Sequence, residues 1–147
     1  MKIIIGSDHA ATQFKSEILA HLQSRGADAT NFDDNDKSGM EYPDYAREIA
    51  AKIAAGEFDM GILLCGTGAG MSITANKVHG IRAVVCSEPY TARLSREHND
   101  ANILCIGARV VGTELAKTIV DAFLDAKFEG GRHQLRVDKI MAIEIRA

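Results

Sequence analysis

Short apolar runs alternate with amphipathic segments along most of this 147-residue chain. Strands are expected at 2–6, 27–32, 60–64, 81–86 and 103–107, and helices at 11–25, 43–55, 70–78, 89–97, 112–125 and 133–145. Strands that alternate with helices form βαβ units, which build a parallel sheet. The sequence therefore predicts an α/β fold: a Rossmann-like doubly wound sheet of about five parallel strands with helices on both faces.

Length and composition predict a single domain spanning 1–147, with a polar loop at 33–42. The formal net charge of −3 argues against a general nucleic-acid or anionic-membrane role, and no apolar stretch is long enough to span a bilayer. The three cysteines are widely spaced and form no CxxC pair, so neither a disulfide framework nor a zinc ribbon is expected. A cytoplasmic location is the default expectation.

Polar residues follow the strands at the points where a site is expected. Ser7-Asp8-His9 follow the first strand, Cys65 and a glycine-rich loop the third, Ser87-Glu88 the fourth, and Ala108-Arg109 the fifth. In parallel α/β sheets, ligands bind beyond the carboxyl ends of the strands. We therefore expect the functional site at this edge of the sheet.

The loop Cys65-Gly66-Thr67-Gly68-Ala69-Gly70 is the strongest local signal for chemistry. Backbone N–H groups of such a loop, with a helix N-terminus behind them, form an anion site, and the same field favours the thiolate form of Cys65. The plainer alternative is a buried inert cysteine followed by a tight turn. Cys86 and Cys105 lie within apolar runs and are predicted to be core residues.

Several cofactor and phosphate motifs are excluded by the residues themselves. A dinucleotide fingerprint needs glycine at position 71, and a cysteine phosphatase needs arginine there, whereas this chain has Met71. No Walker sequence and no close metal-ligand spacing occurs. We therefore expect no cofactor and no metal.

Three further groups have both a structural and a functional interpretation. Asp8 is either a helix N-cap or a ligand contact, and His98-Asn99 are either a helix C-terminus or a proton shuttle with a polar neighbour. Arg132 and Arg136, four residues apart, either form a solvated helix face or bind phosphate, which Arg109 could also contact. A thiol, a histidine, an oxyanion loop and arginines suit proton transfer beside a carbonyl in a small phosphorylated sugar, as in aldose–ketose isomerisation.

Motifs along almost the full chain strengthen this interpretation. In chain order they are Gly6-Ser7-Asp8-His9, Cys65-Gly66-Thr67-Gly68-Ala69-Gly70, Ala75-Asn76-Lys77, Gly80-Ile81-Arg82-Ala83, Ser95-Arg96-Glu97-His98-Asn99-Asp100-Ala101-Asn102, Gly107-Ala108-Arg109 and Glu129-Gly130-Gly131-Arg132-His133. Together they closely resemble the ribose-5-phosphate isomerase B family. The resemblance implies metal-independent interconversion of D-ribose 5-phosphate and D-ribulose 5-phosphate, a step of the pentose phosphate pathway.

The resemblance also implies roles for the catalytic residues. Cys65 would be the base that moves a proton between C2 and C1, and His98 would open the furanose ring. The enediolate would be held by the side chain of Thr67 and by loop N–H groups from Gly66, Gly68, Ala69 and Gly70.

The remaining implied contacts are to substrate. Asp8 would contact the ring hydroxyls, Asn99 would hold the open chain, and Tyr42 would line the sugar pocket. Phosphate would be bound by His9, Arg132 and Arg136, with Arg109 nearby.

Members of this family are homodimers or homotetramers whose sites lie between subunits, so the segment at about 130–147 is expected at a subunit interface. Relatives also isomerise six-carbon sugar phosphates such as allose 6-phosphate or galactose 6-phosphate, and the sequence leaves this alternative open. A non-catalytic sugar-phosphate sensor would not need both Cys65 and His98, and a thiol redox enzyme would want a resolving cysteine nearby.

Overall fold

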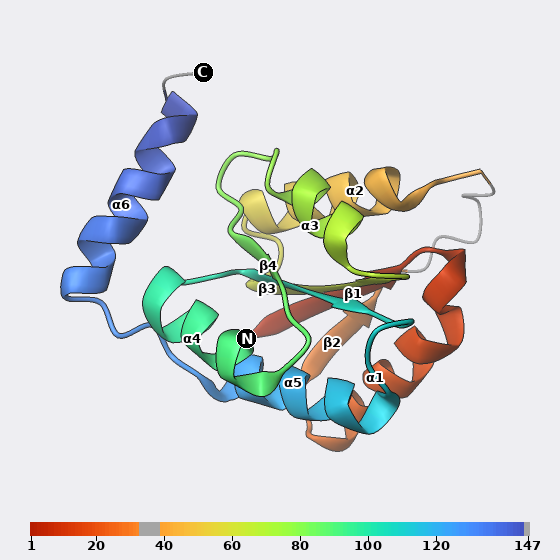
Figure 1. Ribbon diagram of the computed structural model, residues 1–147. Helices are drawn as coiled ribbons and strands as arrows, with labels where there is room; N and C mark the ends of the chain where they lie inside the picture. Colours follow the sequence, from red (N-terminus) through yellow and green to blue (C-terminus); the bar gives the residue numbers. More distant parts are fainter. Residues whose placement is uncertain (33–38, 146–147) are drawn as a thin grey trace.

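The computed structural model describes residues 1–32 and 39–145 and is built on a five-stranded parallel sheet (Figure 1). The strands lie in the order β2-β1-β3-β5-β4, and their bounds are Lys2–Ser7 (β1), Asp28–Asn31 (β2), Met60–Cys65 (β3), Ala83–Val85 (β4) and Ile103–Gly107 (β5). Every pairing within the sheet is parallel. The predicted doubly wound α/β fold is confirmed.

Helices cover both faces of the sheet. Their bounds are His9–Ala11 (the 3₁₀ turn η1), Thr12–Ser24 (α1), Tyr42–Ala54 (α2), Ala69–Ala75 (α3), Pro89–Asn99 (α4), Thr113–Asp125 (α5) and Arg132–Ile145 (α6). Figure 1 shows α1, α4 and α5 on one face and α2 and α3 on the other. No helix in the described part of the chain is long and apolar enough to cross a membrane.

The central strand β3 is buried along its whole length and supplies side chains to both cores. Alternate residues of a strand point to opposite faces of the sheet. Ile62 and Leu64 lie in the core shared with α1 and α5, whereas Leu63 and Cys65 lie in the core shared with α2 and α3. The thiol of Cys65 therefore faces the side of the sheet from which α3 begins.

Most predicted boundaries agree with the structure to within two residues, and the differences have local causes. The fourth strand is shorter than predicted because the N–H of Arg82 donates to the side-chain oxygen of Asn102 (2.8 Å) rather than to a strand. Pro43 is the second rather than the first residue of α2, since Tyr42 already belongs to the helix. Most of the predicted polar loop, 33–38, lies outside the described residues.

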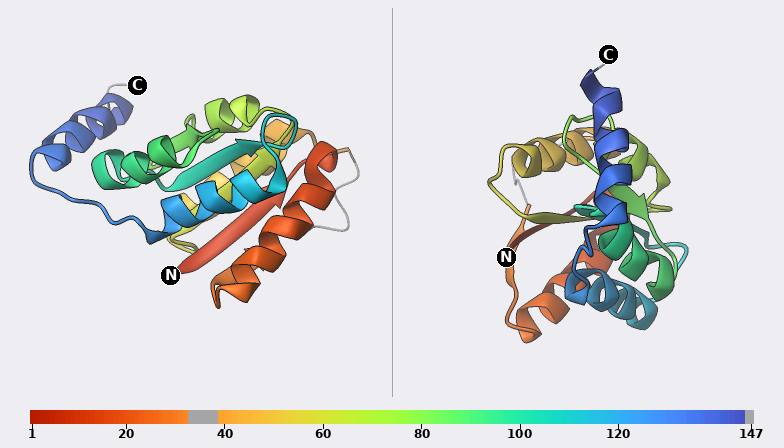
Figure 2. Two further views of the ribbon diagram at one scale, coloured as in Figure 1. Left: turned by 60° about the horizontal axis from the view of Figure 1, so that its bottom comes forward. Right: turned by 90° about the vertical axis from the view of Figure 1, so that its left-hand side faces the viewer.

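Helix α6 lies beyond the amino ends of the strands, away from the main body, as Figures 1 and 2 show. Its first turns are held by the buried side chains of His133 and Val137. Its later turns make two polar contacts: the backbone N–H of Gly80 donates to the Glu144 carboxylate (3.0 Å), and Arg82 Nη1 contacts Met141 Sδ (3.3 Å). Four apolar side chains of the helix remain exposed: Leu135, Ile140, Ile143 and Ile145.

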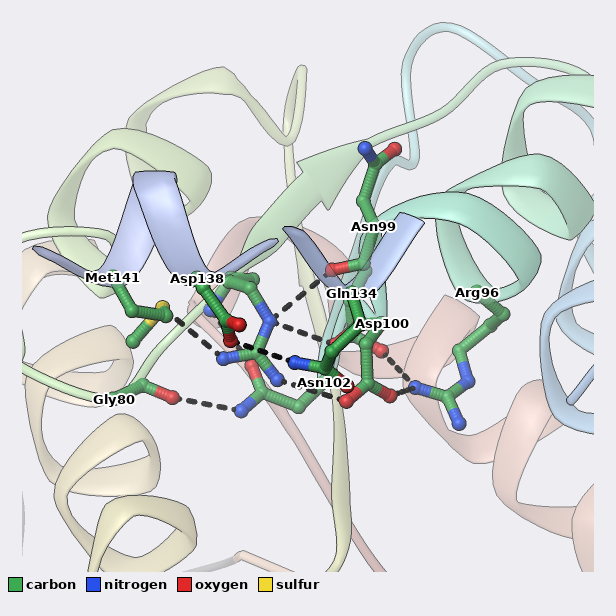
Figure 3. A network of polar contacts seen from close by, with 10 residues as sticks. Gly80, Arg96, Asn99, Asp100, Asn102, Gln134, Asp138 and Met141 are labelled. Carbon is green, nitrogen blue, oxygen red and sulfur yellow. Dashed lines mark hydrogen bonds and ion pairs between the residues drawn. The ribbon is translucent and has the colours of Figure 1, made fainter. Parts of the chain in front are cut away.

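A polar network organises this amino edge of the sheet (Figure 3). Asp100 has left-handed backbone geometry (φ 48°) and ends α4. Its carboxylate accepts a hydrogen bond from Arg96 Nη1 (2.9 Å) and lies 3.4 Å from Arg82 Nη2. Asn102 donates to the carbonyl of Gly80 (2.9 Å). The network holds the end of α4 against the start of β4.

Replacing Asp100 by alanine is expected to lower the free energy of unfolding by about 1–3 kcal/mol, because the buried guanidinium of Arg96 loses its carboxylate partner. Asp100→Asn is the matched control, since asparagine tolerates left-handed geometry and keeps an acceptor. Urea unfolding of both variants measures the difference. Equal stability of Asp100→Ala and the wild type would show that the network contributes nothing.

Candidate active site

The carboxyl end of β3 places Cys65 directly below the glycine-rich loop. The cysteine is 5% exposed, and the backbone N–H of Gly68 points at its Sγ (3.1 Å). A donor aimed at sulfur stabilises the charge of a thiolate, which is the form that accepts a proton. The N–H of Ala69 donates to Thr67 Oγ1 (3.2 Å), so two N–H groups of the loop have partners within it.

The loop lies unusually close to its neighbours because glycines face it. A Cβ on Gly107 would lie 2.6 Å from the backbone carbonyl carbon and oxygen of Thr67, so no larger residue fits without moving the loop. A Cβ on Gly70 would lie 2.1 Å from the ring of Tyr42. The half-exposed Tyr42 ring therefore packs against the first turn of α3, at the same edge as Cys65.

Asp8, His9 and Arg109 lie at this carboxyl edge too. The N–H of Asp8 donates to the carbonyl of Leu64 (3.3 Å), and its Oδ1 accepts from the N–H of Ala10 (3.0 Å). Of the two alternatives for Asp8, the structure shows the cap, for the short η1 turn, and the ligand contact stays a prediction. The N–H of Arg109 donates to the carbonyl of Gly66 (3.0 Å), and its guanidinium lies over Gly66. His9 and Arg109 are exposed.

His98 and Asn99 lie at the opposite edge of the sheet. They form the last turn of α4, which runs back from the carboxyl end of β4 to the amino end of β5. The six residues of β3 alone separate the two edges by about 16 Å. Arg132 and Arg136 are on α6, beyond this amino edge, and both are exposed. One copy of the chain therefore does not bring His98 to Cys65.

His98 has two close neighbours that the sequence interpretation did not assign to the site. Its ring is stacked on that of His133, with centroids 4.1 Å apart and an interplanar angle of 8°. Its Nε2 lies 3.4 Å from Glu129 Oε1. Desolvation lowers the pKa of His133, and the nearby charges of His98 and Arg132 lower it further, whereas Glu129 opposes them. The sequence did contain a signal for these two residues, because both belong to the motif Glu129-Gly130-Gly131-Arg132-His133.

The other two cysteines are structural, as predicted. Cys86 and Cys105 are both buried. Burial, with a smaller contribution from the Glu88 carboxylate, raises the pKa of the Cys86 thiol to about 12. Burial raises the pKa of Cys105 as well. A raised pKa disfavours the thiolate form of both cysteines, which fits their prediction as core residues.

Comparisons with known proteins identify the family to which the chain belongs. The model of the ribose/galactose isomerase family matches residues 3–140, and the chain belongs to this family. The chain is 57% identical to ribose-5-phosphate isomerase B of Escherichia coli (strain K12) over 145 residues, which cover 99% of this chain and 97% of the relative.

Solved structures are equally similar. Ribose-5-phosphate isomerase B of Clostridium thermocellum is 53% identical, with a TM-score of 0.94 over 99% of both chains. The enzyme of Mycoplasma genitalium, solved with bound ribulose 5-phosphate, is 40% identical, with a TM-score of 0.92 over 99% of this chain and 97% of that one.

The close approach of Gly107 to Thr67 yields a test of the loop geometry. Gly107→Ala should displace the loop, lower the free energy of unfolding by about 1–3 kcal/mol and reduce turnover, because the added methyl meets backbone. Gly61→Ala is the control, since its methyl meets side chains and no backbone, and the tightest approach is to the flexible end of Ile53 (2.6 Å). Thermal unfolding and activity are measured for both variants. Gly107→Ala with wild-type activity would contradict the argument.

Proposed function

We propose that this chain interconverts D-ribose 5-phosphate and D-ribulose 5-phosphate through an enediolate, with Cys65 as the base. The observation that carries the proposal is the Cys65 thiol at the carboxyl edge of the sheet, with the Gly68 N–H directed at its sulfur (3.1 Å). The high identity to ribose-5-phosphate isomerase B over nearly the whole chain supports the same activity. As a member of this family, the chain is an aldose–ketose isomerase.

In the proposed reaction, the Cys65 thiolate takes the proton from C2 of the open-chain aldose. The electrons of the broken C–H bond form the C1–C2 double bond, and negative charge develops on the carbonyl oxygen. The Thr67 hydroxyl and the loop N–H groups that have no partner in the loop stabilise this charge. After a proton moves between the two oxygens, Cys65 returns its proton to C1 and the ketose forms.

Ring opening requires a second proton donor, and His98 is proposed for this step. The ring oxygen accepts its proton as the bond from C1 to the ring oxygen breaks. Asp8 contacts the sugar hydroxyls in this scheme, and Asn99 holds the open chain. Phosphate would be held by the positive charges of His9, Arg132 and Arg136, with Arg109 nearby.

These assignments require two copies of the chain, because Cys65 and His98 lie at opposite edges of one sheet. A two-fold symmetric pair would place the amino edge of each copy against the carboxyl edge of the other and form two equivalent sites. The exposed apolar side chains of α6 support an interface there, as does a hollow lined by Ile81, Ile140 and Ile143. We therefore propose a homodimer, or a homotetramer made of two such dimers, with the segment at about 130–147 at the interface.

Metal independence, a cytoplasmic location and one domain over 1–147 belong to the same proposal. A six-carbon sugar phosphate is the alternative substrate, and the names of the similar proteins support the five-carbon substrate over it. A sensor without turnover would not need a thiol directed into the loop.

The first test compares wild type with Cys65→Ala, in the presence of EDTA, for ribulose 5-phosphate formation from ribose 5-phosphate. Wild type should be active, and Cys65→Ala should lose at least about 100-fold in kcat while binding phosphate ligands within a few-fold, because only the base is removed. Cys86→Ala is the matched cysteine control and should remain active. Equal loss of binding and turnover in Cys65→Ala would contradict the role of Cys65.

The shared site is tested by mixing inactive variants. Cys65→Ala and His98→Asn, unfolded and refolded together, should recover about a quarter of wild-type activity, since about half of the dimers then hold one intact site. As a control, pairs of wild type and the double variant are purified by two tags. They should be inactive if each site is shared, whereas a site built within one chain would keep about half the activity.

A further inference from the structure

The surroundings of His98 are more highly organised than an exposed histidine at a helix end would require. The His133 ring is 7% exposed and nearly parallel to the His98 ring. The Glu129 carboxylate lies 3.4 Å from Nε2 of His98 and 4.0 Å from Nε2 of His133. His98 itself is about one-third exposed, so one face of its ring is covered while part of the side chain remains accessible.

The backbone holds these neighbours in place. The N–H of Glu129 donates to the carbonyl of Glu97 (3.0 Å), which fixes residue 129 beside the last turn of α4. Gly130 and Gly131 then adopt left-handed geometry (φ 65° and 57°), and the N–H of His133 donates to the carbonyl of Gly130 (3.0 Å). Two consecutive left-handed residues are costly for any other amino acid. This turn brings His133 back onto His98.

We propose that His133 and Glu129 are positioning residues that fix the His98 imidazole for proton donation to the sugar ring oxygen. The assignment rests on the proposed isomerase function. Without contacts, an imidazole ring samples a broad range of χ2 angles about the bond that joins it to the rest of the side chain. Stacking on the buried His133 ring fixes the plane of the His98 ring, and the carboxylate of Glu129 fixes which edge of the ring faces away from the substrate.

The proton transfers in this step are balanced. As the bond from C1 to the ring oxygen breaks, its electron pair stays on the ring oxygen, which takes the proton of the His98 imidazolium. The anomeric hydroxyl loses its proton to a base or to water and becomes the aldehyde oxygen. His98 is neutral afterwards and regains its proton from solvent.

A shared metal ion fits this cluster less well. Ligand atoms of His98, Glu129 and His133 all lie within 4.8 Å of one another. However, the lone pairs of an imidazole lie in the plane of its ring, and two rings only 8° from parallel do not direct them at one point. The stacked geometry suits orientation of one ring by the other.

The test separates ring opening from enediolate formation. Isomerisation of ribose 5-phosphate requires both steps. Exchange of a C1 hydrogen of ribulose 5-phosphate with D₂O, followed by NMR, requires only the enediolate, because a ketopentose phosphorylated on O5 forms no furanose ring. His133→Leu should reduce isomerisation about 10-fold to 100-fold and change the exchange rate by less than about 3-fold.

Conservative variants sharpen this test. His133→Phe restores a ring for stacking and should recover most of the isomerisation rate, whereas Glu129→Gln should reduce isomerisation with little effect on exchange. His21→Leu removes a histidine paired with Asp121 far from the site and should change neither rate. Parallel loss of both rates in His133→Leu, or failure of His133→Phe to recover isomerisation, would overturn the proposal.

A second readout is independent of turnover. The His133 ring should shift the NMR resonances of the His98 ring protons upfield, and His133→Leu should abolish that shift. An unchanged His98 spectrum in the variant would overturn the stacking. If wild type neither isomerises nor exchanges, the proposed function fails, while the spectrum still reports whether His133 positions His98.

Discussion

The parallel pairing of β3 with β5 is the constraint on which the carboxyl-edge site depends. The register aligns Cys65 with Gly107, so the residue beside the thiol on the neighbouring strand has no side chain. The backbone of Thr67 then lies directly over β5, and the N–H of Gly68 reaches Sγ of Cys65. A parallel sheet buried on both faces makes this register rigid, because a slip by one residue would turn every core side chain to the wrong face.

Most of this edge could be predicted from sequence because its signals are local. An apolar run, then a cysteine, then alternating glycines predicts both the strand and the turn that follows it, and the structure places these residues as expected. The capping role of Asp8 and the burial of Cys86 and Cys105 follow from equally local patterns. The close approach of Tyr42 to Gly70 could not be predicted, since it depends on how α2 and α3 pack together.

The opposite edge was predicted less completely, because its geometry depends on contacts distant in sequence. The helix ending at His98 was expected, but the stacking of His133 on His98 depends on two left-handed glycines and on a backbone bond from residue 129 to residue 97. No periodicity encodes those contacts. Local contacts hold Cys65 against the glycine-rich loop and His98 against His133. These two groups lie at opposite ends of the same sheet.

This separation has a consequence for how the proposed enzyme is organised. Under this proposal each edge alone would hold half of the required chemistry: a base with an oxyanion loop at one, and a proton donor with phosphate-binding arginines at the other. An isologous pair would bring the complementary halves together twice, so that catalysis would depend on association. The same contact would cover the apolar side chains of α6 that a single copy leaves in water. Burial of those side chains would then stabilise the arrangement that completes the site.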